Sequence, residues 1–167
     1  MPGKCGKNEV LAFLDERKVP YDSLSHAAVF TMEEMDAAGI SERGLILKNL
    51  FLRDSKGKRH FLISVPEEVR IDLRTVHELL GCTKVSFASA ERLEKYLGVA
   101  QGSVSPLGIL NDESKSVVVV FDSSLVGKTN IGVHPNDNTA TVFLSFSDLR
   151  GIIEEHGNEV RLIDFSE

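Results

Sequence analysis

Residues 45–65 read LILKNLFLRDSKGKRHFLISV, in which two apolar runs flank a short polar segment. The runs 45–53 and 59–65 have the length and the apolar content that are typical of strands. The segment between them, residues 54–58, contains a glycine, as the loops that join hairpin strands commonly do. We therefore predict a β-hairpin over residues 45–65.

Turn and capping residues divide the rest of the chain into further strands and helices. Strand-like runs occupy residues 21–24, 85–87, 117–121, 130–133, 139–145 and 160–165. Apolar residues at helical spacing follow five residues that can cap a helix, namely Asn8, Thr31, Asp72, Ser89 and Ser147. Because helices and strands are interleaved while hairpins recur, the sequence predicts a mixed α/β fold with helices packed around a central sheet.

The composition is typical of one globular domain, which we expect to span residues 1–167. Apolar residues make up 42% of the chain, and no apolar run reaches the roughly 18 residues that a membrane-spanning helix needs. The N-terminus lacks the apolar stretch of a signal peptide, and Cys5 and Cys82 lie far apart without a C-x-x-C motif. We therefore expect no disulfide framework and a location in the reducing cytoplasm.

Charge is unevenly distributed along the chain. The net charge of -6 argues against a protein that coats nucleic acid non-specifically. Four cations and one acid nevertheless lie between residues 53 and 59, and the cations are Arg53, Lys56, Lys58 and Arg59. This segment is either solvated surface or a contact for RNA phosphates.

Several well-known motifs are absent from the sequence. It contains no G-x-G-x-x-G and no G-x-S-x-G, and Gly127-Lys128-Thr129 lacks the earlier glycine of a phosphate-binding P-loop. The five histidines form no H-x-x-x-H pair. We expect neither a metal nor an organic cofactor.

Three polar segments remain as candidates for a functional site. Lys48 and Asn49 lie inside an apolar strand, where a lysine is costly unless its ammonium has a partner or a cleft. In a regular strand their side chains point to opposite faces, and a bulge would bring both to one site. Residues 102–108, GSVSPLG, form a tight loop whose N–H groups can hold a carbonyl oxygen or a phosphate. His134 ends one strand and His26 follows another, where polar site residues often lie.

Taken alone, each segment has an ordinary structural explanation, but their order along the chain resembles one family. The segments are LKNLFL at 47–52, HFL at 60–62, GSVSPLG at 102–108, HP at 134–135 and NTAT at 138–141. The chain resembles the bacterial prolyl-tRNA-synthetase-associated editing domains, or YbaK-like superfamily, and above all its free-standing members. The family's mid-strand lysine falls on Lys48, and its G-x-x-x-P loop runs from Gly102 to Pro106.

The resemblance implies a curved mixed central sheet and an enzyme that hydrolyses the ester of mischarged aminoacyl-tRNA, above all Ala-tRNA(Pro), without a cofactor. It implies the acceptor end of proline tRNA as partner and prolyl-tRNA synthetase as a further partner, with neither DNA nor a membrane. Catalytic roles are expected for Lys48, which would bind the terminal phosphate or ribose, and for the loop residues Gly102 and Ser103, which would hold the ester carbonyl. The residues expected to line the substrate site are Asn49, His134, Val104, Ser105, Pro106 and His26. The residues expected to contact tRNA are Arg53, Lys56, Lys58 and Arg59.

Other functions remain open at this point. One is a deacylase for another small amino acid on tRNA, such as cysteine or serine. Another is a non-catalytic module that binds aminoacyl-tRNA or a synthetase, and a third is a small-molecule-binding α/β domain. A deacylation assay separates the two deacylases, for alanine or for another small amino acid, from the two kinds of binding protein.

Overall fold

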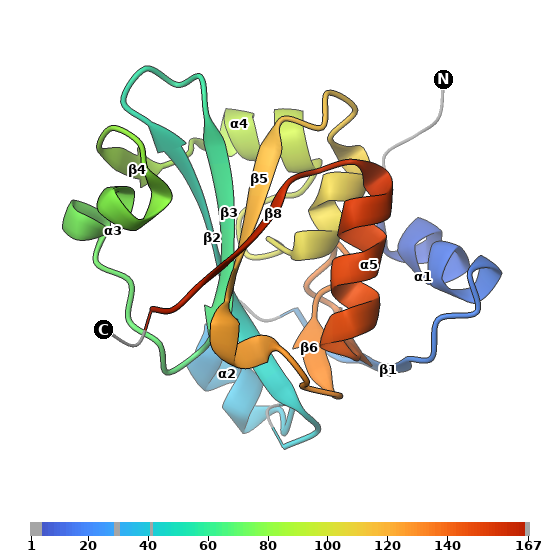
Figure 1. Cartoon of the computed structure of the whole chain (residues 1–167). Helices are drawn as coiled ribbons and strands as arrows, with labels where there is room; N and C mark the ends of the chain where they lie inside the picture. Colours follow the sequence, from blue (N-terminus) through green and yellow to red (C-terminus); the bar gives the residue numbers. More distant parts are fainter. Residues whose placement is uncertain (1–4, 29–30, 41, 166–167) are drawn as a thin grey trace.

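The computed structural model describes residues 5–28, 31–40 and 42–165, and its strands form one mixed sheet (Figure 1). The strand order is β1-β7-β6-β2-β3-β5-β8, and β4 pairs with β2 outside this path. The strands are β1 (Asp22–Ser25), β2 (Leu45–Asp54), β3 (His60–Pro66), β4 (Val85–Phe87), β5 (Val117–Asp122), β6 (Ile131–Val133), β7 (Ala140–Leu144) and β8 (Val160–Ile163). β2 and β3 form the predicted antiparallel hairpin, whereas β5 runs parallel to both β3 and β8. The predicted mixed α/β fold is confirmed.

Helices cover both faces of this sheet. The α-helices are α1 (Lys7–Glu16), α2 (Met32–Ala37), α3 (Leu73–Leu80), α4 (Ala90–Arg92) and α5 (Phe146–His156). A π-helical turn, η1 (Leu93–Leu97), continues α4, and η2 (Pro106–Asn111) and η3 (Ser123–Leu125) are 3-10 helices. In Figure 1, α3 lies on one side of β2 and β3, and α1 and α5 lie on the other. No helix in the described ranges is long and apolar enough to cross a membrane.

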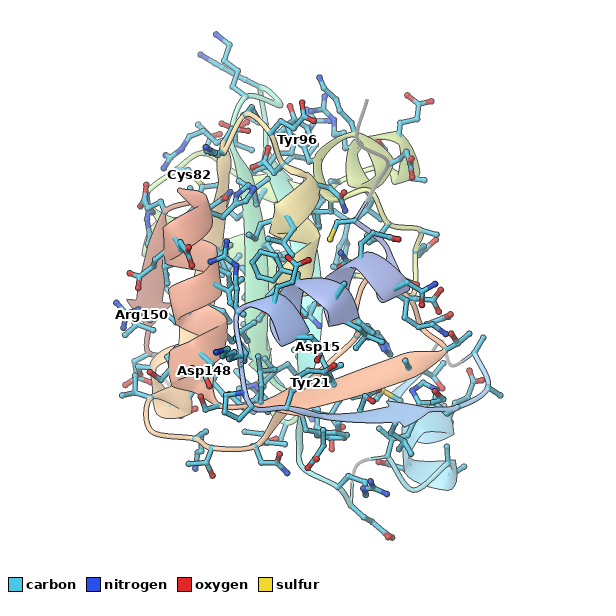
Figure 2. The ribbon with its side chains drawn as sticks, turned by 90° about the vertical axis from the view of Figure 1, so that its right-hand side faces the viewer. Asp15, Tyr21, Cys82, Tyr96, Asp148 and Arg150 are labelled. Atoms are coloured by element: carbon cyan, nitrogen blue, oxygen red, sulfur yellow. The ribbon has the colours of Figure 1, made fainter. Side chains whose placement is uncertain are left out.

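The N-terminal helix is joined to the last helix and to the first strand by side-chain contacts. Arg17, just after α1, forms an ion pair with Glu155 of α5. The Tyr21 hydroxyl donates to the Asp15 carboxylate over 2.9 Å, which holds the turn between α1 and β1 (Figure 2). These contacts hold α1 against the face of the sheet that α5 also covers.

Alternation along the central hairpin divides the core into two layers. Phe51 and Leu62 are register partners and face the larger cluster, to which α1 and α5 contribute. Leu52 and Phe61, the next register pair, face a second cluster that includes Val76 of α3. Each face of β2 and β3 is therefore packed, apart from the stretch of β2 described next.

One edge of β2 is interrupted. β3 pairs with β2 continuously from Leu47 to Arg53 along one edge. On the other edge, β6 pairs only with Leu45 and Ile46, while β4 pairs only with residues 52–54. Within the described chain, this second edge of β2 therefore has no strand partner at residues 47–51, between the contacts with β6 and β4.

Two predicted helix starts are wrong. α1 begins after Gly6, two residues before Asn8, because the Gly6 N–H is satisfied by the Glu9 carboxylate over 3.0 Å. α5 is capped by Ser145 and not by Ser147. The earlier start places Phe146 in the core as the first residue of the helix. The caps at Thr31, Asp72 and Ser89 are confirmed.

Candidate active site

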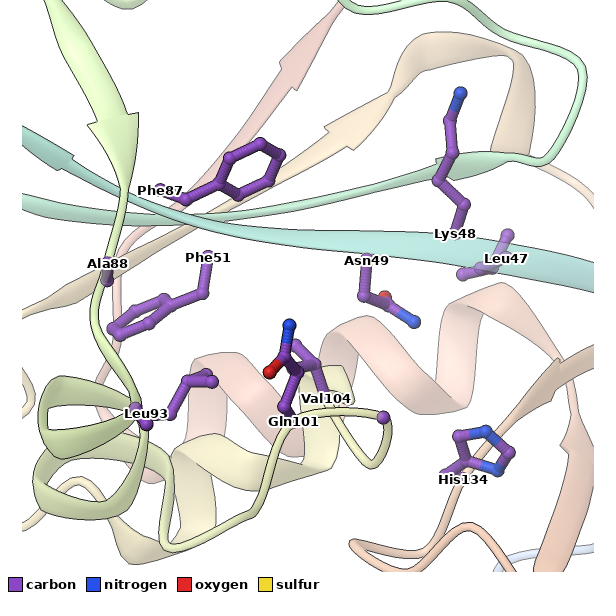
Figure 3. A pocket seen from close by; sticks show the side chains of 12 residues that line it. Leu47, Lys48, Asn49, Phe51, Phe87, Ala88, Leu93, Gln101, Val104 and His134 are labelled. Atoms are coloured by element: carbon purple, nitrogen blue, oxygen red, sulfur yellow. The ribbon is translucent and has the colours of Figure 1, made fainter. Parts of the chain in front are cut away.

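A cavity of about 440 Å³ lies beside the unpaired stretch of β2 (Figure 3). Its lining comes from β2, from β4 with the segment that follows it, from the loop after η1, and from the end of β6. The lining residues are Leu47, Lys48, Asn49, Phe51, Phe87, Ala88, Ala90, Leu93, Gln101, Gly102, Val104 and His134. The cavity therefore brings together the three polar segments that the sequence singled out.

Lys48 and Asn49 both border the cavity, but their side chains leave opposite faces of β2 (Figure 3). The pairing with β3 is continuous through both residues, so β2 has no bulge here. The Asn49 amide oxygen accepts a hydrogen bond from the Ser64 hydroxyl over 2.6 Å, which holds the amide on the side of His134. The Lys48 ammonium forms no ion pair or hydrogen bond with any residue that the structure describes, so it is available to an anionic ligand.

The backbone of β2 also faces the cavity. Neighbouring residues of a strand direct their N–H and C=O groups to opposite edges. The Leu45 N–H bonds to the Asn130 carbonyl, and the Phe51 carbonyl accepts from the Ala88 N–H over 2.9 Å. Asn49 lies at the same parity between them, so its backbone groups point to the interrupted edge.

Some polar groups of the loop after η1 are used in hydrogen bonds within the loop and with η2. Gly102 has a φ of +94°, which glycine adopts without strain, and the Ser103 N–H donates to the Ala100 carbonyl over 3.0 Å. The Ser105 hydroxyl accepts from the Leu107 N–H, which starts η2 at Pro106. Ser103, Ser105 and Pro106 are buried and do not line the cavity.

Two residues of this loop do line the cavity. These residues, Gly102 and Val104, make no backbone N–H bond within the described chain. Their N–H groups are therefore the donors that this loop offers to a ligand.

His134 lies at the cavity wall as a neutral imidazole. Its Nδ1 faces the Ala140 carbonyl at 2.9 Å and therefore carries the proton, which leaves Nε2 as an acceptor. Burial, the largest effect, lowers the pKa of His134 below its ordinary value. His26 lies beside it, with ring centroids 6.3 Å apart, but its Nε2 is hydrogen-bonded to the Thr141 hydroxyl at 3.0 Å. His26 supports this wall and does not line the cavity.

A second, very small cavity adjoins the first. Its volume is about 10 Å³, and it shares Leu47, Asn49 and His134 with the larger cavity. The rest of its lining is mainly apolar and consists of Met35, Ile46, Gly132, Val133 and Thr141. A space of this size holds a single water-sized group.

The predicted basic segment forms the β2–β3 loop, outside the cavity. Its Asp54 carboxylate accepts from the Lys58 and Arg59 N–H groups and so holds the loop closed. Arg92 of α4 joins this loop by donating to the Gly57 carbonyl over 3.1 Å. The same guanidinium lies 2.9 Å from Nε2 of His60, a buried residue of β3.

Sequence reasoning missed Phe87, Gln101 and Arg92. Phe87 is 60% exposed at the cavity, and the Gln101 amide points across the cavity toward β2 (Figure 3). The one signal for Phe87 in the sequence was the presence of an aromatic residue at the end of the short predicted strand 85–87. In the described part of the chain, no three His, Cys, Asp or Glu side chains gather closely enough to hold a metal ion.

Comparisons with known proteins identify the family. Residues 26–152 match the family described as the aminoacyl-tRNA editing domain. The prolyl-tRNA editing protein ProX of Acetoanaerobium sticklandii is 49% identical over 158 residues, which cover 95% of this chain and 96% of that protein. The prolyl-tRNA synthetase associated domain-containing protein 1 of Danio rerio is 33% identical, over 95% of this chain and 87% of that protein. A solved structure described as "a putative trans-editing enzyme for prolyl tRNA synthetase" shares the fold, with a TM-score of 0.72, 24% identity and 96% of each chain covered.

The chain belongs to the aminoacyl-tRNA editing domain family, as its motifs indicated. It is a trans-editing hydrolase that deacylates aminoacyl-tRNA.

Proposed function

We propose that this deacylase acts in the cytoplasm on alanine that is wrongly attached to proline tRNA. The observation that supports this choice most strongly is the pair of adjoining cavities. The larger one, about 440 Å³, has room for a ribose and its ester, and the smaller one, about 10 Å³, has room for one methyl group. Alanine carries a single methyl group, whereas the proline ring overlaps the walls of the smaller cavity. The similarity to ProX, a prolyl-tRNA editing protein, supports the choice of tRNA.

The ester carbonyl is placed against the loop after η1. Ester hydrolysis needs donors that stabilise the negative charge developing on the carbonyl oxygen. The N–H groups of Gly102 and Val104 make no hydrogen bond to other backbone groups of the described residues, and both residues border the cavity, so they take this role in our proposal. Ser103 supports the turn and is not a donor to the ester, because its N–H is already bonded.

The other polar groups position the substrate. Lys48 lies on the opposite face of β2 from Asn49, so its ammonium binds the phosphate beside the terminal ribose rather than the ester. Asn49 and the neutral His134 border both cavities, where they orient the aminoacyl group. The vicinal ribose hydroxyl or a backbone carbonyl orients the attacking water. His26 is hydrogen-bonded to Thr141 and supports the cavity wall without contacting the substrate.

Hydrolysis of four esters on proline tRNA tests the proposal. The substrates are alanyl, seryl, cysteinyl and prolyl esters, assayed at catalytic enzyme concentration. We expect selective loss of alanine. Preferential loss of serine or cysteine would keep the mechanism and overturn the substrate, and no hydrolysis with tRNA binding intact would favour a binding module.

Single-turnover kinetics test the assignment of Lys48. Lys48→Ala should weaken tRNA binding and slow deacylation, and Lys48→Arg should retain part of both because it keeps the charge. An unchanged rate with unchanged tRNA affinity in Lys48→Ala would remove Lys48 from the mechanism.

A further inference from the structure

Phe87 is an exposed aromatic side chain at the mouth of the larger cavity. Four large apolar side chains of the described residues are exposed, namely Leu79, Phe87, Val126 and Leu162. Phe87 is the aromatic one among the four, is 60% exposed, and is the one that lines the cavity. Exposing a phenylalanine ring to water is unfavourable, so an occupant that covers the ring gains stability.

Phe87 lies on the same side of β2 as Lys48. Phe87 pairs in register with Leu52, and Leu52 and Lys48 are separated by four residues, so all three share one face. Figure 3 shows the Phe87 ring and the Lys48 side chain both rising from the side of β2 that is opposite Asn49. At about 3.3 Å per residue, about 13 Å of strand separates the two positions.

The charges at the end of β2 where β4 pairs favour a polyanion. Arg53 is the register partner of Ser86, the residue before Phe87. The guanidinium groups of Arg53 and Arg92 converge on Gly57, where a Cβ atom would lie 3.2 Å and 2.8 Å from their Nη2 atoms. Neither forms an ion pair with an acid in the described residues, so two uncompensated cations lie at the end of β2 where β4 pairs, on the face of the strand opposite the Phe87 ring.

An exposed aromatic ring, a lysine on the same face of the strand and two arginines at the end of that strand are groups that together bind single-stranded nucleic acid, through base stacking and phosphate contacts. We propose that the Phe87 ring is the stacking platform for the adenine at the 3′ end of the tRNA. The terminal ribose then carries the ester over the open edge of β2 into the cavity, and Lys48 contacts a phosphate on the Phe87 side. This assignment rests on the proposed deacylase function, because the 3′-terminal adenosine is the nucleoside that bears the ester.

Deacylation kinetics provide the first test. Phe87→Ala should raise KM for alanyl-tRNA roughly 5- to 150-fold, the range produced by loss of one base–aromatic stack, with a smaller change in kcat. Phe87→Trp should restore KM because indole also stacks. Leu79→Ala, which removes another exposed apolar side chain away from the cavity, is the matched control and should leave KM unchanged.

A stacking readout separates this inference from the function on which it rests. Uncharged proline tRNA with 2-aminopurine in place of the terminal adenine should lose fluorescence on binding the wild-type protein and Phe87→Trp, but not on binding Phe87→Ala. If the wild type hydrolyses alanyl-tRNA while Phe87→Ala matches it in both KM and quenching, the stacking assignment is wrong. If the wild type quenches 2-aminopurine but hydrolyses no ester, the proposed function fails and the nucleobase site stands.

Discussion

Lowering the pH from 7.5 to 5 should destabilise the protein by about 2 kcal/mol through His60. This histidine is 1% exposed, its ring is stacked against Phe51, and its Nε2 faces the Arg92 guanidinium at 2.9 Å. Burial is the main cause, and the Arg92 charge the second, that lowers the pKa of His60 to about 4. The folded state therefore holds His60 neutral, with Nε2 as the acceptor for Arg92.

The magnitude follows from the difference between this pKa and the ordinary value of 6.5. Below pH 6.5 the unfolded chain binds a proton at His60, whereas the folded chain does not until about pH 4. The contribution of His60 to the free energy of unfolding is therefore fully present above pH 6.5 and is lost as the pH falls. By pH 5 the loss is about 2 kcal/mol, and its limit below pH 4 is about 3.4 kcal/mol. The lowered pKa values of the carboxyls of Asp54 and Asp137 act at lower pH, because Asp titrates near pH 4 even when unfolded.

Urea unfolding at pH 7.5, 6.5, 5.5 and 5 measures this loss. His60→Gln keeps an acceptor for Arg92 but does not titrate, so its free energy of unfolding should fall about 2 kcal/mol less than that of the wild type over this range. His134 contributes in the same direction in both proteins, since burial lowers its pKa too, and the comparison cancels it. Arg92→Gln should give an intermediate decline, because burial of His60 remains. Equal declines in wild type and His60→Gln would refute the reasoning.

Three further predictions concern the hairpin and the smaller cavity. Replacing the loop cations Lys56, Lys58 and Arg59 together with alanine should weaken tRNA binding and reduce the slope of log K against log salt by up to about 3. Binding titrations at several salt concentrations measure this slope, and an unchanged slope would show that the loop does not contact tRNA. Gly132→Ala should destabilise the protein by about 1–3 kcal/mol in urea unfolding, because its Cβ would lie 2.6 Å from Ile46 Cδ1 and 2.8 Å from Phe143 Cε1. The matched change Gly151→Ala, in α5 with nothing within 4 Å, should instead stabilise by about 0.5–1 kcal/mol. Ile46→Ala enlarges the smaller cavity and should raise hydrolysis of seryl and cysteinyl esters roughly 10-fold relative to alanyl ester, whereas unchanged ratios would show that this cavity does not receive the side chain.

Local pattern predicted the elements well because each is specified by neighbours in sequence. The hairpin of β2 and β3 needed only two apolar runs and a glycine-containing loop, and it formed as predicted. Ser145 and Ser147 show the limit of such reasoning, because both serines precede the same apolar spacing. The choice between them depends on burying Phe146 in the core, which is a tertiary effect.

The members of the candidate site were predicted in part, and its arrangement was not predicted. Lys48, Gly102 and His134 do border one cavity. The sequence could not predict that the cavity lies at an interrupted edge of β2, because this edge depends on β6 and β4 pairing with opposite ends of one strand. Phe87 was missed for the same reason. Its register partner in β2 is Leu52, which lies 35 positions earlier in the chain, and only the pairing of β4 with β2 brings the two together.

The methyl-sized cavity cannot by itself identify the tRNA, because correctly charged alanyl-tRNA carries the same ester. Rejecting glycine there also gains only about 1–3 kcal/mol for the missing methyl group. Selection must therefore use contacts outside the cavity, and β2 connects the two regions rigidly. Asn49 borders the cavity, and Arg53, four residues and about 13 Å further along the same strand, begins the basic loop. Arg92 and His60 fix this loop against Phe51 of the cavity wall, so a tRNA held by the loop presents its ester at a fixed distance. A tRNA with a different acceptor stem would then be bound with its ester displaced from Gly102, which lowers the rate of hydrolysis even where the amino acid fits.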